Sequence, residues 1–243
     1  MPLPRRVLPV CYARSMVVDY PRLLSLAVHE FRTPASVVGG YLRMLQHTDD
    51  APLTERQARM IDEAEKSCAR LVALVAEMSE LSKLDAGQVS LVRDPLDVFR
   101  LTAEVAELVH EAVEREVHLE VRGPADGAVL SGDSKRLRAA FDAVFRAILR
   151  EKAGPCTVIA ERRREMRDGK DVAVIVVAES GSVAAAYDRA PGPFDDHRGG
   201  LGLALPLARR AIEGLGGQLW SPASVSENDP LARGSAVIVL PID

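Results

Sequence analysis

The chain has few residues of the kinds that build disulfide frameworks, membrane spans or nucleic-acid interfaces. Its three cysteines, Cys11, Cys68 and Cys156, are an odd number without CxxC or metal-ligand spacing, which argues against a disulfide framework. The longest uninterrupted apolar run, residues 172–178, is far shorter than the roughly 20 residues that cross a bilayer. A net charge of −4 without a long basic cluster argues against nucleic-acid binding. We therefore expect a cytoplasmic protein with no membrane span.

Aromatic residues are also scarce, at 4% of 243 residues, whereas 47% of the residues are hydrophobic. The core is therefore expected to consist mainly of Leu, Val and Ala side chains in one or two globular domains. Residues 1–20 contain three prolines and show no periodicity, which predicts a loose N-terminal arm.

A helical hairpin is predicted over residues 21–86. Apolar residues recur there at gaps of three and four, the spacing of one helix face, at Leu24, Val28, Phe31, Ala35, Val38, Leu42 and Leu45. Thr54 and Gln57 form a capping-box pair that starts a second helix, and Gly87 is placed to end it. This second helix has its own apolar face, at Ile61, Ala64, Cys68, Leu71, Val75 and Met78. Because two helices cannot bury both faces alone, the pattern predicts a homodimer through residues 21–85 that forms a four-helix bundle.

Residues 92–243 mix helical and extended patterns and are predicted to form a second domain. Helices are expected at 98–113, 134–150 and 201–213, and strands at 117–121, 157–161, 171–179, 218–220 and 235–240. Strands interleaved with helices of one layer predict an α/β sandwich. The fold class is therefore α+β, with a two-helix hairpin followed by an α/β sandwich.

The string His29-Glu30-Phe31-Arg32-Thr33-Pro34 on the first helix carries the most chemical information. His29 lies beside the apolar face and is expected to face solvent. Glu30 can accept a proton from one imidazole nitrogen and leave the other as a neutral nucleophile, and Thr33 lies one turn further on. Pro34 removes a helical hydrogen bond, which predicts a bend beside His29. A lone histidine in such a pattern is usually structural, so the argument depends on the whole string.

HEFRTP, within LLSLAVHEFRTPASVVGGYLRMLQ, closely resembles the H-box of sensor histidine kinases. The resemblance continues through LVAEMSELSKLDAGQVSL and DPLDV, which are similar to the exit from the dimerisation and phosphotransfer domain of that family. It implies that His29 takes a phosphoryl group from ATP, that Glu30 acts as the base, and that Thr33 aids dephosphorylation of a response regulator. The implied partner is the receiver domain of that regulator, which accepts the phosphoryl group on an aspartate.

The second half of the chain is similar to the Bergerat ATP-binding domain of the same family. The run from Gly199 to Leu205 opens a predicted helix, where glycines and free amides suit phosphates. The segments GGQL at 216–219 and GSAVIVLP at 234–241 resemble the family's later motifs. The implied cofactor is ATP, and the implied binding residues are Arg150, Glu179, Gly181, Gly200, Leu201 and Gly202.

Two motifs depart from the family pattern. Ala143 and Ala147 stand where the family has asparagines, and Ala147 takes the place of the magnesium-binding one. A methyl group cannot ligate a hard cation, so Mg²⁺ is doubtful and no metal-ligating residue is predicted. Val183 replaces a glycine, and the segment between Ser182 and Gly199 is shorter than the usual lid over ATP, with Phe194 as a remnant of its aromatic anchor.

Three functional hypotheses remain open on this basis. The first is a histidine kinase that autophosphorylates on His29 and transfers the phosphoryl group to a response regulator. The second is a pseudokinase-like histidine phosphotransferase or phosphatase with weak or no ATP use, in which the ATP domain is structural. The third is a dimeric scaffold without chemistry, which would leave the HExxT string unexplained. Input is expected from a partner, such as a separate sensor protein, or from a domain outside this chain.

Overall fold

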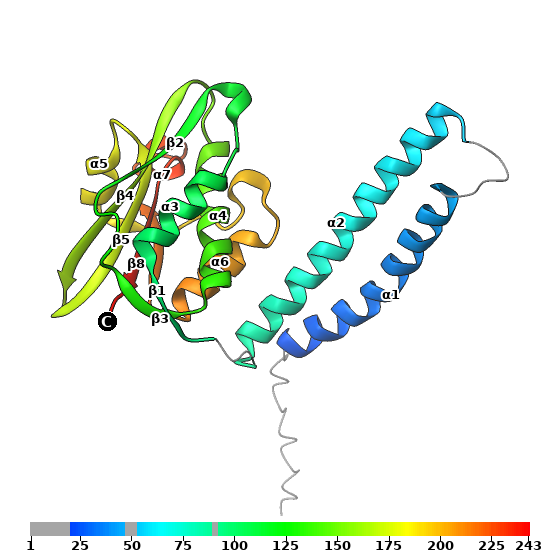
Figure 1. Cartoon of the computed structure of the whole chain (residues 1–243), viewed down its shortest axis with the longest axis horizontal. Coiled ribbons are helices and arrows are strands. Elements are labelled where there is room, and N and C mark those ends of the chain that lie inside the picture. Colours follow the sequence, from blue (N-terminus) through cyan, green and yellow to red (C-terminus); the bar gives the residue numbers. More distant parts are fainter. Residues whose placement is uncertain (1–19, 47–52, 89–91) are drawn as a thin grey trace, which may run out of the picture.

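The computed structural model describes residues 20–46, 53–88 and 92–243, which form a helical hairpin followed by an α/β domain (Figure 1). The hairpin consists of α1 (Tyr20–Gln46) and α2 (Glu55–Asp85). The predicted arm over 1–20, apart from Tyr20, and most of the predicted turn between the helices lie outside the described residues. None of the helices in these ranges is long and apolar enough to cross a membrane.

Both ends of α2 follow the local signals. The Thr54 hydroxyl accepts a hydrogen bond from the Gln57 amide at 3.4 Å, and the Gln57 side chain accepts one from the Thr54 amide at 3.0 Å. This confirms the predicted capping box. The helix ends at Asp85, and Gly87 follows with φ +64°, a backbone conformation that favours glycine.

The two helices pack in antiparallel register and leave much of their apolar surface uncovered. The Cys68 thiol donates a hydrogen bond to the Ala35 carbonyl oxygen at 3.0 Å, which ties the centre of α2 to α1. Val28 is buried, whereas Phe31 is 59% exposed and Val38 is 52% exposed. The expected apolar faces are therefore present, but one hairpin does not bury them.

The α/β domain contains five helices and two short 3-10 turns: α3 (Val98–Leu108), η1 (Val113–Arg115), α4 (Ser134–Arg150), α5 (Val183–Asp188), η2 (Arg198–Gly200), α6 (Ala204–Glu213) and α7 (Pro230–Arg233). Its strands are β1 (Asp94–Asp97), β2 (Val117–Arg122), β3 (Val129–Gly132), β4 (Cys156–Arg167), β5 (Lys170–Glu179), β6 (Pro191–Gly192), β7 (Gln218–Pro222) and β8 (Ala236–Pro241). Six strands form the main sheet in the order β2-β4-β5-β8-β7-β6, and β1 pairs with β3. The β2–β4 pair is parallel, and the other pairs are antiparallel.

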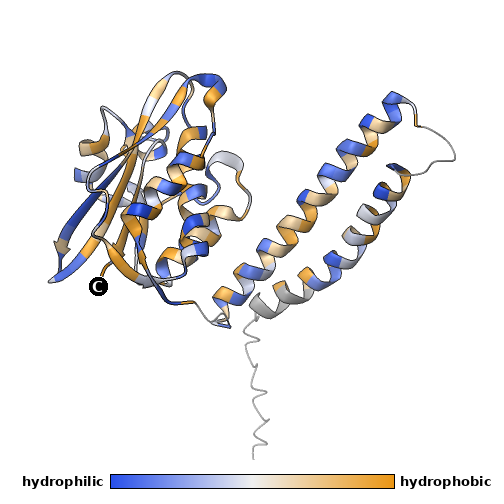
Figure 2. Ribbon diagram, viewed as in Figure 1, coloured by the Kyte–Doolittle hydropathy of each residue, from blue (hydrophilic) through white to orange (hydrophobic). Residues whose placement is uncertain are grey.

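The core lies between the sheet and the layer of α3, α4 and α6, on the side that faces the hairpin (Figure 1). Fully buried aromatic and branched side chains from both layers fill it, including Phe141, Phe145 and Ile175. The central strands are predominantly apolar, whereas α1 and α2 alternate between polar and apolar residues (Figure 2). The predicted α+β architecture is confirmed.

Three details differ from expectation. The helix expected over 98–113 ends at Leu108, because Val109 is extended and Ala112 adopts φ +62° before η1 begins. The helix expected over 201–213 begins at Ala204, because the preceding glycines have positive φ values. Helices were expected in one layer, but α5 packs on the opposite face of the sheet, where Val183 and Ala186 meet the outer valines.

Candidate functional site

The string from His29 to Pro34 lies on the open surface of α1. His29, Glu30 and Thr33 are all exposed, whereas the preceding Val28 is 4% exposed. This confirms that the helix turns His29 outward while its neighbour anchors the hairpin. α1 continues through Pro34 as one helix, so the chain is not broken beside the histidine. An exposed imidazole with a carboxylate and a hydroxyl on the same stretch of helix is open to a reaction partner.

An apolar groove of about 610 Å³ runs between the helices next to this string. Its lining includes Phe31 and Pro34 from α1, and Leu74, Val75 and Met78 from α2. Cys68 of α2 lies opposite Ala35 of α1. Because the helices are antiparallel, His29, six residues before Ala35, is at the level of Leu74, six residues after Cys68.

The glycine loop, which we define as residues 199–202, lies against that same turn of α2. Gly199, Gly200 and Gly202 have φ values of +66°, +63° and +64°, which favour glycine. A β-carbon added at Gly202 would lie 3.1 Å from the Leu74 Cδ2 atom. The loop predicted to hold phosphates is thus packed on the phosphotransfer hairpin.

Ala147, at the expected metal-ligand position, is covered by the same loop. Ala147 is fully buried, and a β-carbon added at Gly199 would lie 3.1 Å from its Cα atom. The small residues at 147 and 199 therefore let η2 pack directly on α4. Because Ala147 is fully buried, an asparagine at 147 would need space within the packed interior.

Arg150, predicted to contact phosphate, is held by protein groups. Its Nη1 donates to the Gly199 carbonyl oxygen at 2.9 Å, and its Nε donates to a Glu111 carboxylate oxygen at 2.9 Å. The hydrogen bond from Arg150 keeps the pKa of Glu111 below its ordinary value, and Arg146 adds to this effect. Arg150 thus links the glycine loop to α4.

Arg198, which was not singled out from the sequence, fixes the loop from its other side. It is 5% exposed and donates hydrogen bonds to the Ser235 and Ala232 carbonyl oxygens, at 3.0 and 3.1 Å. Its guanidinium lies 4.7 Å from the centre of the Phe194 ring, and burial lowers its pKa. Phe194, read as a remnant of a lid anchor, is instead buried in the core beside Arg198. In the sequence, the position of Arg198 directly before two glycines was the signal that could have indicated this role.

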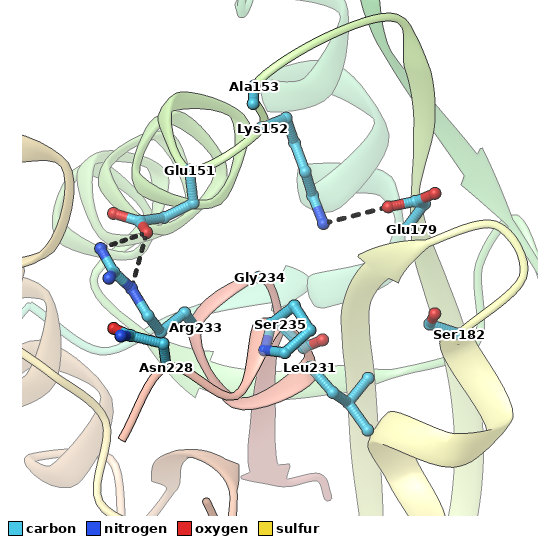
Figure 3. Close-up of a pocket in the computed structure, with 11 residues that line it drawn as sticks. Glu151, Lys152, Ala153, Glu179, Ser182, Asn228, Leu231, Arg233, Gly234 and Ser235 are labelled. Carbon is cyan, nitrogen blue, oxygen red and sulfur yellow. Dashed lines mark hydrogen bonds and ion pairs between the residues drawn. The ribbon is translucent and has the colours of Figure 1, made fainter. Parts of the chain in front are cut away.

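Glu179 lies in a different place, at a cavity of about 580 Å³ beyond the end of β5 (Figure 3). Lys152 pairs with Glu179 at 3.6 Å, and Arg233 pairs with Glu151 at 2.9 Å. The full lining is Glu151, Lys152, Ala153, Glu179, Ser182, Asn228, Pro230, Leu231, Arg233, Gly234 and Ser235. No residue of the glycine loop is among them, so the predicted ATP-binding residues fall at two separate locations. Gly181 lies in the turn after Glu179 and has open space beside it.

The residue at position 147 does not fit a magnesium ion. Within 20–46, 53–88 and 92–243, no group of three or more His, Cys, Asp or Glu side chains could hold a metal. Ala147 offers no oxygen, and the glycine loop covers it. We therefore derive no metal-dependent step for this chain.

The short lid has a structural explanation that sequence reasoning missed. Pro191 and Gly192 form β6, an edge strand that pairs with Pro222 and Ser221 of β7. The connection from α5 to the glycine loop therefore runs around the edge of the sheet. Two residues are too few to show the alternating pattern of a strand.

Comparisons with known proteins agree with the hairpin and the sheet domain. Residues 22–87 match the His Kinase A (phospho-acceptor) domain. The sensor protein GacS of Pseudomonas syringae pv. syringae is 28% identical over 214 residues, which cover 82% of this chain and 23% of GacS. The signal transduction histidine-protein kinase BarA of Escherichia coli is 25% identical over 203 residues, which cover 79% of this chain and 22% of BarA. The chain thus spans about a quarter of the length of these curated relatives.

The architecture is also found among solved structures. Full-length ShkA in complex with AMPPNP has a TM-score of 0.63 at 22% identity, covering 91% of this chain and 45% of that chain. This likeness shows the fold, a helical hairpin followed by an α/β domain. Residues 22–87 thus belong to the His Kinase A phospho-acceptor domain, and the chain as a whole is similar to sensor histidine kinases.

Proposed function

We propose that this chain is the catalytic core of a two-component histidine kinase, with His29 as the phosphoacceptor. The carrying observation is that His29, Glu30 and Thr33 are exposed on α1 within the phospho-acceptor match. The phosphoryl group then passes to an aspartate on the receiver domain of a response regulator. A bound ATP would supply that group, and the AMPPNP complex of ShkA supports nucleotide use by this fold.

The chain's own residues perform the acceptor chemistry. The free imidazole nitrogen of His29 attacks phosphorus, a P–N bond forms, and the P–O bond to the leaving group breaks. Glu30 receives the imidazole proton and thereby keeps the attacking nitrogen nucleophilic. In the return step a carboxylate of the regulator attacks the phosphoryl group, the P–N bond breaks, and the proton returns to His29. Thr33 orients the water that later hydrolyses the phosphorylated regulator.

A second copy of the hairpin is the proposed occupant of the apolar groove. The exposed Phe31 and Val38 and the lining of Leu71 and Val75 come from the two predicted seams. Burying this surface against another hairpin forms the four-helix bundle of a homodimer. The cytoplasmic location and the domain boundaries of 21–86 and 92–243 stay predictions.

A second function is favoured by the packing of Gly199 on Ala147. In this alternative, His29 and Thr33 exchange or remove phosphoryl groups, while the α/β domain makes little use of ATP. The ion pair between Arg150 and Glu111 supports this alternative, because Arg150, the cation expected to bind phosphate, is already paired with a carboxylate. Phosphoryl transfer depends on positioning and charge neutralisation, and losing one such contact commonly costs about 10²- to 10³-fold in rate.

Labelling experiments separate the two functions. Incubation with radiolabelled ATP, with and without Mg²⁺, should give an acid-labile, base-stable phosphate that is lost in His29→Gln. If calorimetry finds no ATP binding, the kinase proposal fails. A receiver domain phosphorylated with radiolabelled acetyl phosphate should then release its label as inorganic phosphate when mixed with the protein, and Thr33→Ala should slow that loss. A receiver domain that keeps its label would contradict the alternative.

A further inference from the structure

Carboxylates on α2 face the α/β domain and form ion pairs with it. Asp85, at the end of α2, accepts a hydrogen bond from Arg210 of α6 at 2.6 Å. Glu80, further up the helix, accepts one from Arg136 of α4 at 3.2 Å. α2 is thereby tied to two helices of the other domain.

A third carboxylate, Glu77, reaches the glycine loop itself. A β-carbon added at Gly202 would lie 3.8 Å from the Glu77 Oε2 atom. That oxygen is buried and has no hydrogen-bond partner among the described residues. Gly202 directly precedes the first turn of α6, whose N-cap, Leu203, contributes no side-chain hydrogen bond. The helix dipole there favours a negative group, so Glu77 stands where a phosphate would be attracted.

The interface between these parts is not closely packed. A cavity of about 250 Å³ lies between α2 and the α4–α6 pair, lined by Glu77, Glu80, Leu84, Arg136, Ala139, Ala140, Ala204, Leu207, Ala208 and Ala211. Small alanines and a gap supply little dispersion energy compared with a filled core. The two ion pairs therefore lie beside an apolar contact that is loosely packed.

We infer that Glu80 and Asp85 form an acidic clamp that holds α4 and α6 against α2 in a closed state, in which Glu77 lies beside the glycine loop. This inference rests on the proposed function, for which it supplies a mode of regulation. While the clamp is closed, Leu74 and Glu77 cover Gly202. The glycine loop then stays on α2, at the level of His29 along the hairpin. Opening the clamp exposes the loop to phosphate-bearing ligands. Both ion pairs are partly exposed, so added salt also weakens the clamp.

Amide hydrogen exchange of the full chain tests the clamp without requiring any activity. Arg210→Glu places two negative groups together and should speed exchange of residues 200–207 about fivefold, the factor expected for loss of one partly exposed ion pair. The swap Asp85→Arg with Arg210→Glu should restore the slow rate. Arg138→Glu is the matched control, because Arg138 pairs with Glu104 of α3 and does not contact α2. Unchanged exchange in Arg210→Glu, or equal acceleration in Arg138→Glu, overturns the inference.

AMPPNP without magnesium then probes what the clamp controls. Glu77→Gln removes the negative charge beside Gly202 and should tighten AMPPNP binding severalfold, with no change in Arg138→Glu. If exchange responds as expected while no variant binds AMPPNP, the clamp stands and the nucleotide part of the proposed function fails. If the wild type and Glu77→Gln bind AMPPNP equally tightly, Glu77 does not guard the loop and the inference is wrong.

Discussion

Ala147→Asn tests whether the contact between η2 and α4 closes the nucleotide site. Asparagine would restore the metal-ligating residue type implied by the family resemblance. Ala147 is fully buried, and the added β-carbon at Gly199 would already lie 3.1 Å from its Cα atom. The larger side chain must therefore displace packed neighbours of α4, and the close approach of η2 to the helix backbone at 147 makes that contact sensitive to the change.

The expected cost follows from this packing. Overfilling a packed core costs about 1–3 kcal/mol of unfolding free energy. For a domain of about 150 residues, each kcal/mol lowers Tm by about 2–4 °C. Ala147→Asn should therefore lower the Tm of the protein by several degrees and speed amide exchange at residues 198–202, as followed by calorimetry and mass spectrometry.

Ala143→Asn serves as the control, because it also places an amide on the buried face of α4, where Ala143 is 4% exposed. Both variants lower the free energy of unfolding by burying an amide, but only residue 147 lies against Gly199. Faster exchange at 198–202 should appear in Ala147→Asn alone. If Ala147→Asn has the Tm of the wild type and leaves amide exchange at residues 198–202 unchanged, the packing of η2 on α4 does not exclude a metal ligand at position 147.

Three further outcomes are expected from other parts of the structure. Val38→Asp should weaken the dimer in sedimentation at micromolar concentration, whereas Val37→Asp should not, because both are about half exposed but only Val38 lines the groove. Gly123→Ala should destabilise the protein by about 2 kcal/mol or more, and more than Gly127→Ala, because both have positive φ but only Gly123 would place a β-carbon against the facing carbonyl of β4. The stability advantage of the wild type over Glu111→Gln should be fully present above about pH 4.3, the ordinary pKa of glutamate, and be lost as pH falls below it through the lower pKa that the arginines give this carboxyl in the folded state. An advantage that grows on acidification would refute this.

Local signals explain which parts of the fold could be predicted. The capping box at Thr54 and Gln57 and the glycine after α2 act within a few residues, so their positions were readable. The β4–β5 hairpin was readable in part, from the β-branched residues of β5 and the turn at Asp168, but β4 continues to Arg167, beyond the expected end at 161, through charged residues that lack an apolar strand pattern. The exposure of His29 followed from the helical period alone.

The arrangement of the α/β site depends on contacts between distant residues. The sequence shows alanine at 147 but not the glycine that packs on it from 52 residues away. The burial of Arg198 depends on the carbonyl groups of Ser235, just before β8, and of Ala232 in α7, which no local pattern reveals. The division of the predicted binding residues between a cavity at Glu179 and a loop on α2 is likewise a property of the assembled fold. Whether these residues bind ATP stays a prediction.

The edge strand β6 has a consequence for how fast the glycine loop can move. Only residues 193–197 connect β6 to η2, and they are anchored in turn: Phe194 is buried, and Asp196 is paired with Arg209 of α6 at 2.7 Å. A segment fastened at such short intervals cannot swing as a hinged flap on the timescale of loop diffusion. Its release from α4 is a partial unfolding event, so the dwell time of the loop on α4 is set by the local stability of the domain core, separately from the clamp on α2.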